Sequence, residues 1–176
     1  QRFPVAFVDG KTYWWGGQNG PSTGDSLLPF VKEYQADPLA LSSVIGTGCT
    51  GSAGPMMLSA NDAPWTGRDW TVTGTGFPAS AHGGLILGLG THATPIPISS
   101  LHPAGGSGCD VLVMDDITTL LFPSAGQASF AVSIPYTTFL VGLPLNAQMF
   151  SVEVDAANII TLITSTNGVG GVVGSL

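Results

Sequence analysis

The two cysteines, Cys49 and Cys109, are the residues of this chain whose covalent chemistry is easiest to predict, since each lies in a Gly/Ser-rich stretch typical of a turn. A disulfide between them would close a loop of about 60 residues, which the chain-entropy account values at about 4 kcal/mol. We favour this disulfide, and with it an oxidising, extracellular compartment; two buried thiols are the alternative. Two distant cysteines without C-x-x-C spacing or patterned histidines do not indicate a metal site.

Three histidines recur at ten-residue intervals, at His82, His92 and His102. This spacing could place them on neighbouring loops at one end of a sheet protein, where a metal site is one interpretation. Spacing across Gly/Pro turns sets no coordination geometry, however. We therefore favour ordinary loop histidines.

Asp110, Asp115 and Asp116 lie within seven residues and could supply oxygen ligands to Ca²⁺. The D-x-D-x-D-G pattern with a later glutamate is missing, so calcium is the weaker interpretation. Carboxylates that keep a sheet edge solvated are favoured instead. No metal and no other cofactor is predicted.

Motifs for catalysis are incomplete. Glu153 and Asp155 could be a glycosidase pair, but no cleft can be inferred for them. Gly105–Cys109 lacks the last glycine of the nucleophile elbow G-x-S-x-G. Gly88–Ala93 has the letters of a dinucleotide fingerprint, yet Thr94-Pro95-Ile96-Pro97 forbids the helix that the fingerprint needs. We predict no catalytic residue and no enzyme, and rank a secreted hydrolase last.

Aromatic residues are the remaining candidates for a site. Alternation along a strand sends Trp14 and Trp15 to opposite faces, so a small domain can hardly bury both. Each of these side chains can bury about 150–250 Å² of its surface, so a ligand or another protein surface is needed to cover it. One cover is a sugar ring stacked on Trp14, Trp15 or Trp65, and the other is a second subunit. Trp70 begins a predicted strand and is expected in the core.

The amino-acid composition indicates which kind of secondary structure carries these candidate residues. The 176 residues include 25 Gly and 13 Pro, only 9% are charged, and 44% are hydrophobic. Long surface helices are excluded by the scarcity of charge, and disorder by the apolar content. The net charge of −7 disfavours nucleic acid and anionic lipid as partners. The longest apolar runs are of strand length, so no membrane span is predicted.

Short alternating or apolar runs broken every 8–12 residues by turn residues predict an all-β antiparallel sandwich, Ig-like or jelly-roll-like. Asp9-Gly10 predicts a hairpin between residues 3–8 and 11–15. Thr166-Asn167-Gly168 predicts a second hairpin between residues 158–165 and 169–173. The further strands expected in the sandwich are Met56–Ala60, Trp70–Thr75, Gly84–Leu89, Val111–Met114, Gln127–Ile134 and Ala147–Val154.

The chain divides by composition near residue 45. Residues 1–45 read as an aromatic hairpin arm followed by a flexible linker over Gly16–Asp25 and by residues 26–34, which could be helix or strand. Residues 46–176 read as the disulfide-locked sandwich. The chain begins at Gln1 without a leader, as a mature exported protein does after its signal peptide is cleaved; a fragment cut from a longer chain would begin in the same way.

From about Gly46 to its end, the chain resembles a secreted β-sandwich domain found at the C-terminal end of exported proteins of planctomycetes and other environmental bacteria. The matching residues are Gly48-Cys49-Thr50-Gly51-Ser52, Leu85-Ile86-Leu87-Gly88, Cys109, Gly126-Gln127-Ala128, Ile134-Pro135, Leu143, Gln148 and Ser165-Thr166-Asn167-Gly168. The resemblance implies a sandwich used as an accessory or interaction module. It implies no catalytic residue.

An arm joined by a linker to an open sandwich can leave its own domain and pair with the edge of another copy. Head-to-tail exchange of this kind does not close and produces a filament. We therefore expect an extracellular or cell-surface structural protein, a filament, pilus-like or matrix subunit in adhesion, with a secreted carbohydrate-binding module as the alternative. The expected interface anchors are Phe3, Val5, Phe7, Tyr13, Trp14 and Trp15.

Overall fold

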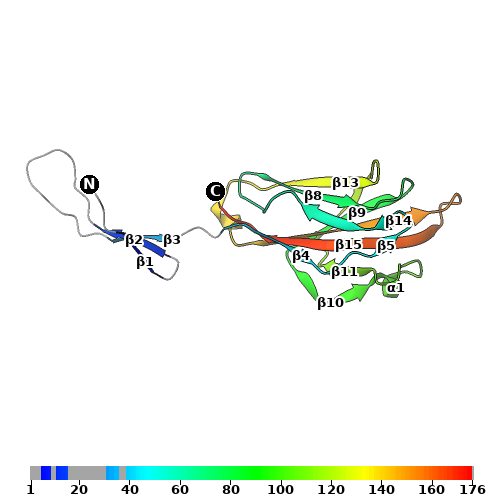
Figure 1. Cartoon of the computed structure of the whole chain (residues 1–176), viewed down its shortest axis with the longest axis horizontal. Helices are drawn as coiled ribbons and strands as arrows, with labels where there is room; N and C mark the ends of the chain where they lie inside the picture. Colours follow the sequence, from blue (N-terminus) through cyan, green and yellow to red (C-terminus); the bar gives the residue numbers. More distant parts are fainter. Residues whose placement is uncertain (1–4, 9–10, 16–30, 36–38, 176) are drawn as a thin grey trace, which may run out of the picture. The chain divides into compact units, whose positions relative to one another are not determined.

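A computed structural model describes residues 5–8, 11–15, 31–35 and 39–175, with side chains from residue 39 onward. The chain forms two compact units, Gln1–Asp37 and Pro38–Leu176. Figure 1 shows that the described elements are almost entirely β-strands. The predicted all-β fold is confirmed.

The first unit is a small antiparallel sheet in which β2 (Lys11–Trp15) lies between β1 (Val5–Val8) and β3 (Val31–Gln35). Val8 lies opposite Lys11, which confirms the predicted first hairpin. Residues 26–34, for which the sequence left helix or strand open, include all of β3 except its last residue, Gln35. Phe3, Asp9-Gly10 and the predicted linker Gly16–Asp25 lie outside the described residues.

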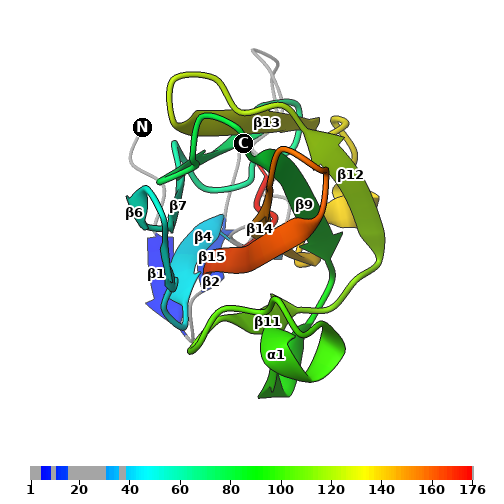
Figure 2. The same ribbon diagram turned by 90° about the vertical axis from the view of Figure 1, so that its right-hand side faces the viewer.

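The second unit is a sandwich of two antiparallel sheets (Figure 2). The larger has the order β12-β9-β14-β15-β4 and the smaller the order β13-β8-β7. The strands of the larger sheet are β12 (Ile117–Leu121), β9 (His82–Gly88), β14 (Pro144–Val154), β15 (Ile160–Val172) and β4 (Leu41–Ile45). Those of the smaller are β13 (Gln127–Ser133), β8 (Asp69–Thr75) and β7 (Met57–Ala60).

Alternation builds the core between these sheets. Along β8, Trp70 and Val72 point inward while their neighbours are less buried, and β13 alternates in the same way. Trp70 is fully buried, as predicted. The buried members of this core are Met56, Leu58, Trp70, Val72, Phe77, Leu85, Leu87, Leu121, Ala128, Ile134, Ala147, Met149, Val169 and Val173.

The other face of the larger sheet carries a smaller layer, seen below β15 in Figures 1 and 2. It consists of β10 (Thr91–Pro97), the short helix α1 (Ile98–Leu101) and β11 (Asp110–Val113), with β10 paired to β11. Figure 1 also shows β5 (Thr50–Gly51), which pairs with β6 (Gly54–Pro55). A single-turn 3₁₀ helix spans Thr138–Leu140.

Two buried amide side chains join these layers where no backbone ladder does. Asn167 of β15 accepts the Leu58 N–H at 2.9 Å and donates to the Leu58 carbonyl at 3.0 Å, so it holds β7. Gln148 of β14 accepts the Leu112 N–H at 2.8 Å and donates to the Asp110 carbonyl at 2.8 Å, so it holds β11. Each amide acts as a piece of backbone because its donor and acceptor have the same arrangement as a peptide group.

The predicted C-terminal hairpin at Thr166-Asn167-Gly168 is wrong. β15 runs without interruption from Ile160 to Val172, and Gly168 pairs with Gln148 on one side and Ile45 on the other. The reason is that the Asn167 amide is buried against β7 instead of serving a turn. The chain turns earlier, between β14 and β15, where Asn158 has a φ of +60°.

The other predicted strands are present, with ends shifted by up to three residues. The boundary between the units differs from the predicted one at residue 45, because β4 pairs along its length with the end of β15. Residues 41–45 therefore belong to the sandwich. The strands β4, β5, β6, β10 and β12 were not predicted.

We expect Asn167→Ala to lower the free energy of unfolding by about 3 kcal/mol, since it leaves the buried N–H and C=O of Leu58 without partners. Asn146→Ala is the control, because this buried amide makes one hydrogen bond, at 3.3 Å to the Gly88 carbonyl. Its expected cost is about 1 kcal/mol. Chemical denaturation measures both, and equal losses would contradict the role given to Asn167.

Candidate functional site

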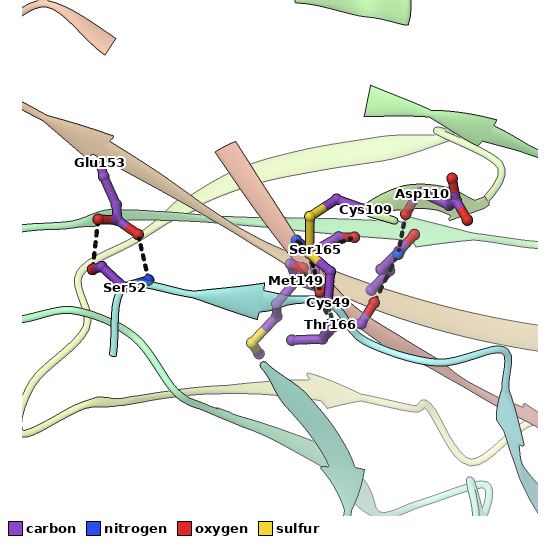
Figure 3. The surroundings of a disulfide bond; sticks show 9 residues. Cys49, Ser52, Cys109, Asp110, Met149, Glu153, Ser165 and Thr166 are labelled. Atoms are coloured by element: carbon purple, nitrogen blue, oxygen red, sulfur yellow. Dashed lines mark hydrogen bonds between the residues drawn. A yellow bond between two sulfur atoms is a disulfide. The ribbon is translucent and has the colours of Figure 1, made fainter. Parts of the chain in front are cut away.

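The cysteines form the predicted disulfide, Cys49–Cys109, with a sequence separation of 60 and both side chains buried (Figure 3). It joins the segment before β5 to the start of β11. Cys49 lies against β15, where its N–H donates to the Ser165 carbonyl at 3.0 Å. Gly48 lets the chain pass close to β15 and to Met56, because a β-carbon there would lie 2.9 Å from the Asn167 nitrogen and would collide with the Met56 carbonyl. The disulfide therefore anchors the smaller layer of β10, α1 and β11 to the larger sheet.

Two of the three aspartates considered for calcium are used locally, and the third, Asp110, begins β11. Asp115 accepts a hydrogen bond from the Thr118 hydroxyl at 2.6 Å, and Asp116 accepts one from the Leu89 N–H at 2.7 Å. Both bonds lie in the connections around β12. Among the described residues, no group of three or more His, Cys, Asp or Glu side chains gathers as a metal site would require.

The three histidines belong to different elements. His82 begins β9, His92 lies in β10 and His102 follows α1. Nδ1 of His102 accepts the Ala104 N–H at 3.1 Å, which orders the turn after the helix. The predicted loop position is therefore wrong for His82 and His92, which lie in strands, and is confirmed for His102.

The two carboxylates considered as a glycosidase pair each order a turn. Glu153 accepts the Ser52 hydroxyl at 2.6 Å and the Ser52 N–H at 3.2 Å, which ties the β5–β6 hairpin to β14 (Figure 3). Asp155 lies beyond the end of β14 and accepts the N–H groups of Ala157 and Ile159 at 2.8 and 2.9 Å. Both are explained by the fold alone.

The glycine-rich stretch after β9 continues as a strand. β9 ends at Gly88 and β10 begins at Thr91, so the helix needed to bind a pyrophosphate at its N-terminus is not formed there. This agrees with the interpretation drawn from Pro95 and Pro97. The glycine before β10 serves a turn between strands.

The larger sheet has two outer edges, β4 and β12, and both are open among the described residues. β4 pairs with β15 on one side only. Its sequence, Leu-Ser-Ser-Val-Ile, has no charge, and Val44 is 72% exposed. Natural edge strands usually carry a charge, a proline or a bulge that blocks further pairing. β4 has none of these protections.

A hollow of about 360 Å³ lies between this edge and β7. Its lining is largely apolar and includes Val44, Met56, Met57 and Leu58. Met57 is 62% exposed where it lines the hollow. An incoming strand could pair with the β4 backbone and place side chains in the hollow, which is the arrangement of strand addition.

Trp65, proposed above as a stacking residue, is half-buried at the end of the sandwich where β8 begins. Two further aromatics stand at the same end and were not recognised as candidates in the sequence. Tyr136 is 79% and Phe139 89% exposed. Trp14 and Trp15 lie in β2, in the unit whose side chains are outside the description.

No family model, curated protein or solved structure matches this chain. The resemblance to the planctomycete sandwich domain therefore remains a prediction that rests on the residues named above. Among the described residues, none of the helices has the length and apolar character needed to cross a membrane.

Replacing both Cys49 and Cys109 by alanine is expected to lower the free energy of unfolding by about 4 kcal/mol, from the loop entropy of 60 residues. Denaturant titration of the variant and the parent measures this loss. The intact mass of the parent, before and after reduction and alkylation, controls for the presence of the bond. A loss below about 1 kcal/mol would mean that the bond does not constrain the unfolded chain.

Proposed function

We propose that this protein is a structural subunit of an extracellular homopolymer, in which residues 1–37 of one copy add strands to the sandwich of the next. The observation that carries the proposal is the unprotected, uncharged edge strand β4 with its apolar hollow. A secreted location is supported by the disulfide. A non-enzymatic character is supported by the local structural roles of the carboxylates.

The first unit supplies a second argument. It has 37 residues, both cysteines lie outside it, and its strands have four or five residues. Sheets of this size are marginal alone, and chains below about 40 residues usually need a disulfide, a metal or a partner to fold. The unit therefore needs a surface to cover its aromatic residues. A second copy of the sandwich offers one.

The pairing within the small sheet shows which of its strands lie at the edges, where another copy could pair. Val5 of β1 and Lys32 of β3 both lie opposite Trp14, in the centre of the sheet. β1 and β3 are its edges; β3 carries Lys32 and Glu33, whereas β1 has no charge, so β1 is the strand suited to extend the ladder of a neighbouring β4. Because the donor and acceptor surfaces differ, each added copy exposes a fresh acceptor and growth continues.

Deleting residues 1–15 is expected to abolish polymerisation while leaving the sandwich folded, because these residues supply β1 and β2. Electron microscopy and sedimentation velocity of the full chain and the deletion variant test this. Circular dichroism and thermal unfolding of the variant control for the fold. A full chain that stays monodisperse at high concentration would contradict the proposal.

Val44→Lys tests the acceptor edge. It adds a charge to the outer strand at a site that is 72% exposed, and we expect it to suppress polymers without loss of fold. Leu120→Lys is the matched control, because Leu120 is 73% exposed on β12, the opposite edge of the same sheet. It should polymerise like the parent. If only Leu120→Lys blocks assembly, the acceptor is β12 and the edge assigned here is wrong.

A further inference from the structure

We propose that the end of the sandwich carrying Tyr136 and Phe139 binds a neutral polysaccharide. This inference stands apart from the assembly, since it concerns the end of the strands and not the edge β4. It assigns a site to residues that the sequence did not single out. The probe classes are insoluble, uncharged glycans.

The first argument is exposure. Phe139 is 89% and Tyr136 79% exposed, although folding normally hides such rings. Thr137 and Thr138 lie between them in the chain, so hydroxyl groups accompany the two rings. Isolated rings among hydroxyl groups suit a ligand that has apolar C–H faces and hydroxyl edges, as a sugar ring does.

The second argument is that the backbone beneath the rings is well held. Gly67 donates to the Ile134 carbonyl at 2.8 Å, and Ile134 donates to the Arg68 carbonyl at 3.0 Å. Leu140, next to Phe139, packs against the core. The hydroxyl of Thr137 caps the 3₁₀ helix. The rings are therefore presented on a fixed frame, which reduces the entropy lost on binding.

The ring of Tyr136 lies across Gly67. A β-carbon added at Gly67 would lie 3.0 Å from Cδ2 of this ring, so the missing side chain leaves room for it. Trp65 is two residues away and half-buried. The end of the sandwich thus gathers three aromatic residues from two loops.

Charge favours a neutral ligand. Residues 38–176 contain seven Asp and Glu and one basic residue, Arg68. This excess repels acidic polysaccharides, nucleic acid and anionic lipid. Asp69 accepts a hydrogen bond from the Ser133 hydroxyl where β8 begins and β13 ends, so this end of the sandwich also carries polar groups.

The experiment measures depletion of the full chain from solution by microcrystalline cellulose, chitin and insoluble β-glucan. A tube without glycan corrects for sedimentation of the protein itself. Full-length Val44→Lys is used wherever the parent polymerises, so that failure of the assembly proposal and failure of this one remain distinguishable. We expect at least one of the three glycans to retain the protein.

Tyr136→Ala and Phe139→Ala should each weaken that retention about fivefold or more, the loss expected for one stacked ring. Phe122→Ala is the matched control, because Phe122 is 83% exposed and follows β12 at the opposite end of the sandwich. It should leave binding within about twofold of the parent. Thermal unfolding checks that all three variants remain folded.

Three results would overturn the proposal. One is the absence of retention on all three glycans. Another is an equal loss of binding in Phe122→Ala, which would mean that any exposed ring suffices. The last is a change in self-association, and not in glycan retention, when Tyr136 or Phe139 is replaced, which would make this end a contact between copies.

Discussion

The sandwich depends on two buried amide groups that take the place of missing backbone pairs. Its sheets are separate ladders. Backbone hydrogen bonds such as that from the Gly106 N–H to the Ile163 carbonyl, at 2.8 Å, join the layers at single points, and buried side chains add further bonds between them. Asn167 supplies them toward β7 and Gln148 toward β11, from neighbouring strands of the larger sheet. A buried amide left without partners would be costly, and here both ends of each are bonded. The two central strands therefore set the positions of the layers on both faces.

Much of the fold could be predicted from composition, turn spacing and alternation, because these reflect burial on one face of a strand. The alternation along β13 and the Asp9-Gly10 hairpin are examples. Asn167-Gly168 misled the prediction, since the same residue pair suits both a turn and a close-packed strand interior. Its tertiary partner, Leu58, lies 109 residues away and cannot be read from local sequence. The disulfide was predictable because the chain has two cysteines and no competing ligand pattern.

For the candidate sites too, local sequence predicted some features and missed others. Carboxylates marked as possible ligands or catalysts order connections instead, as Glu153 does with Ser52 and Asp155 does with the β14–β15 turn. Short polar side chains near turns do this commonly, so their spacing in sequence said little about chemistry. The surfaces that carry the proposals were harder to see, because exposure at β4, Tyr136 and Phe139 depends on where the sheets end. Nothing in local sequence separates these residues from buried ones of the same type.

The two proposed surfaces support one another energetically. A single exposed pair of rings would hold a glycan weakly, because few contacts must offset the lost freedom of both partners. A polymer repeats the site in each subunit, and neighbouring sites then act at high effective concentration on the same chain of sugars. Weak binding by one copy thereby becomes strong adhesion by many. Charge suits both surfaces: β4 carries no charged residue where copies would meet, and the acidic excess of the sandwich leaves its aromatic end suited to a neutral ligand.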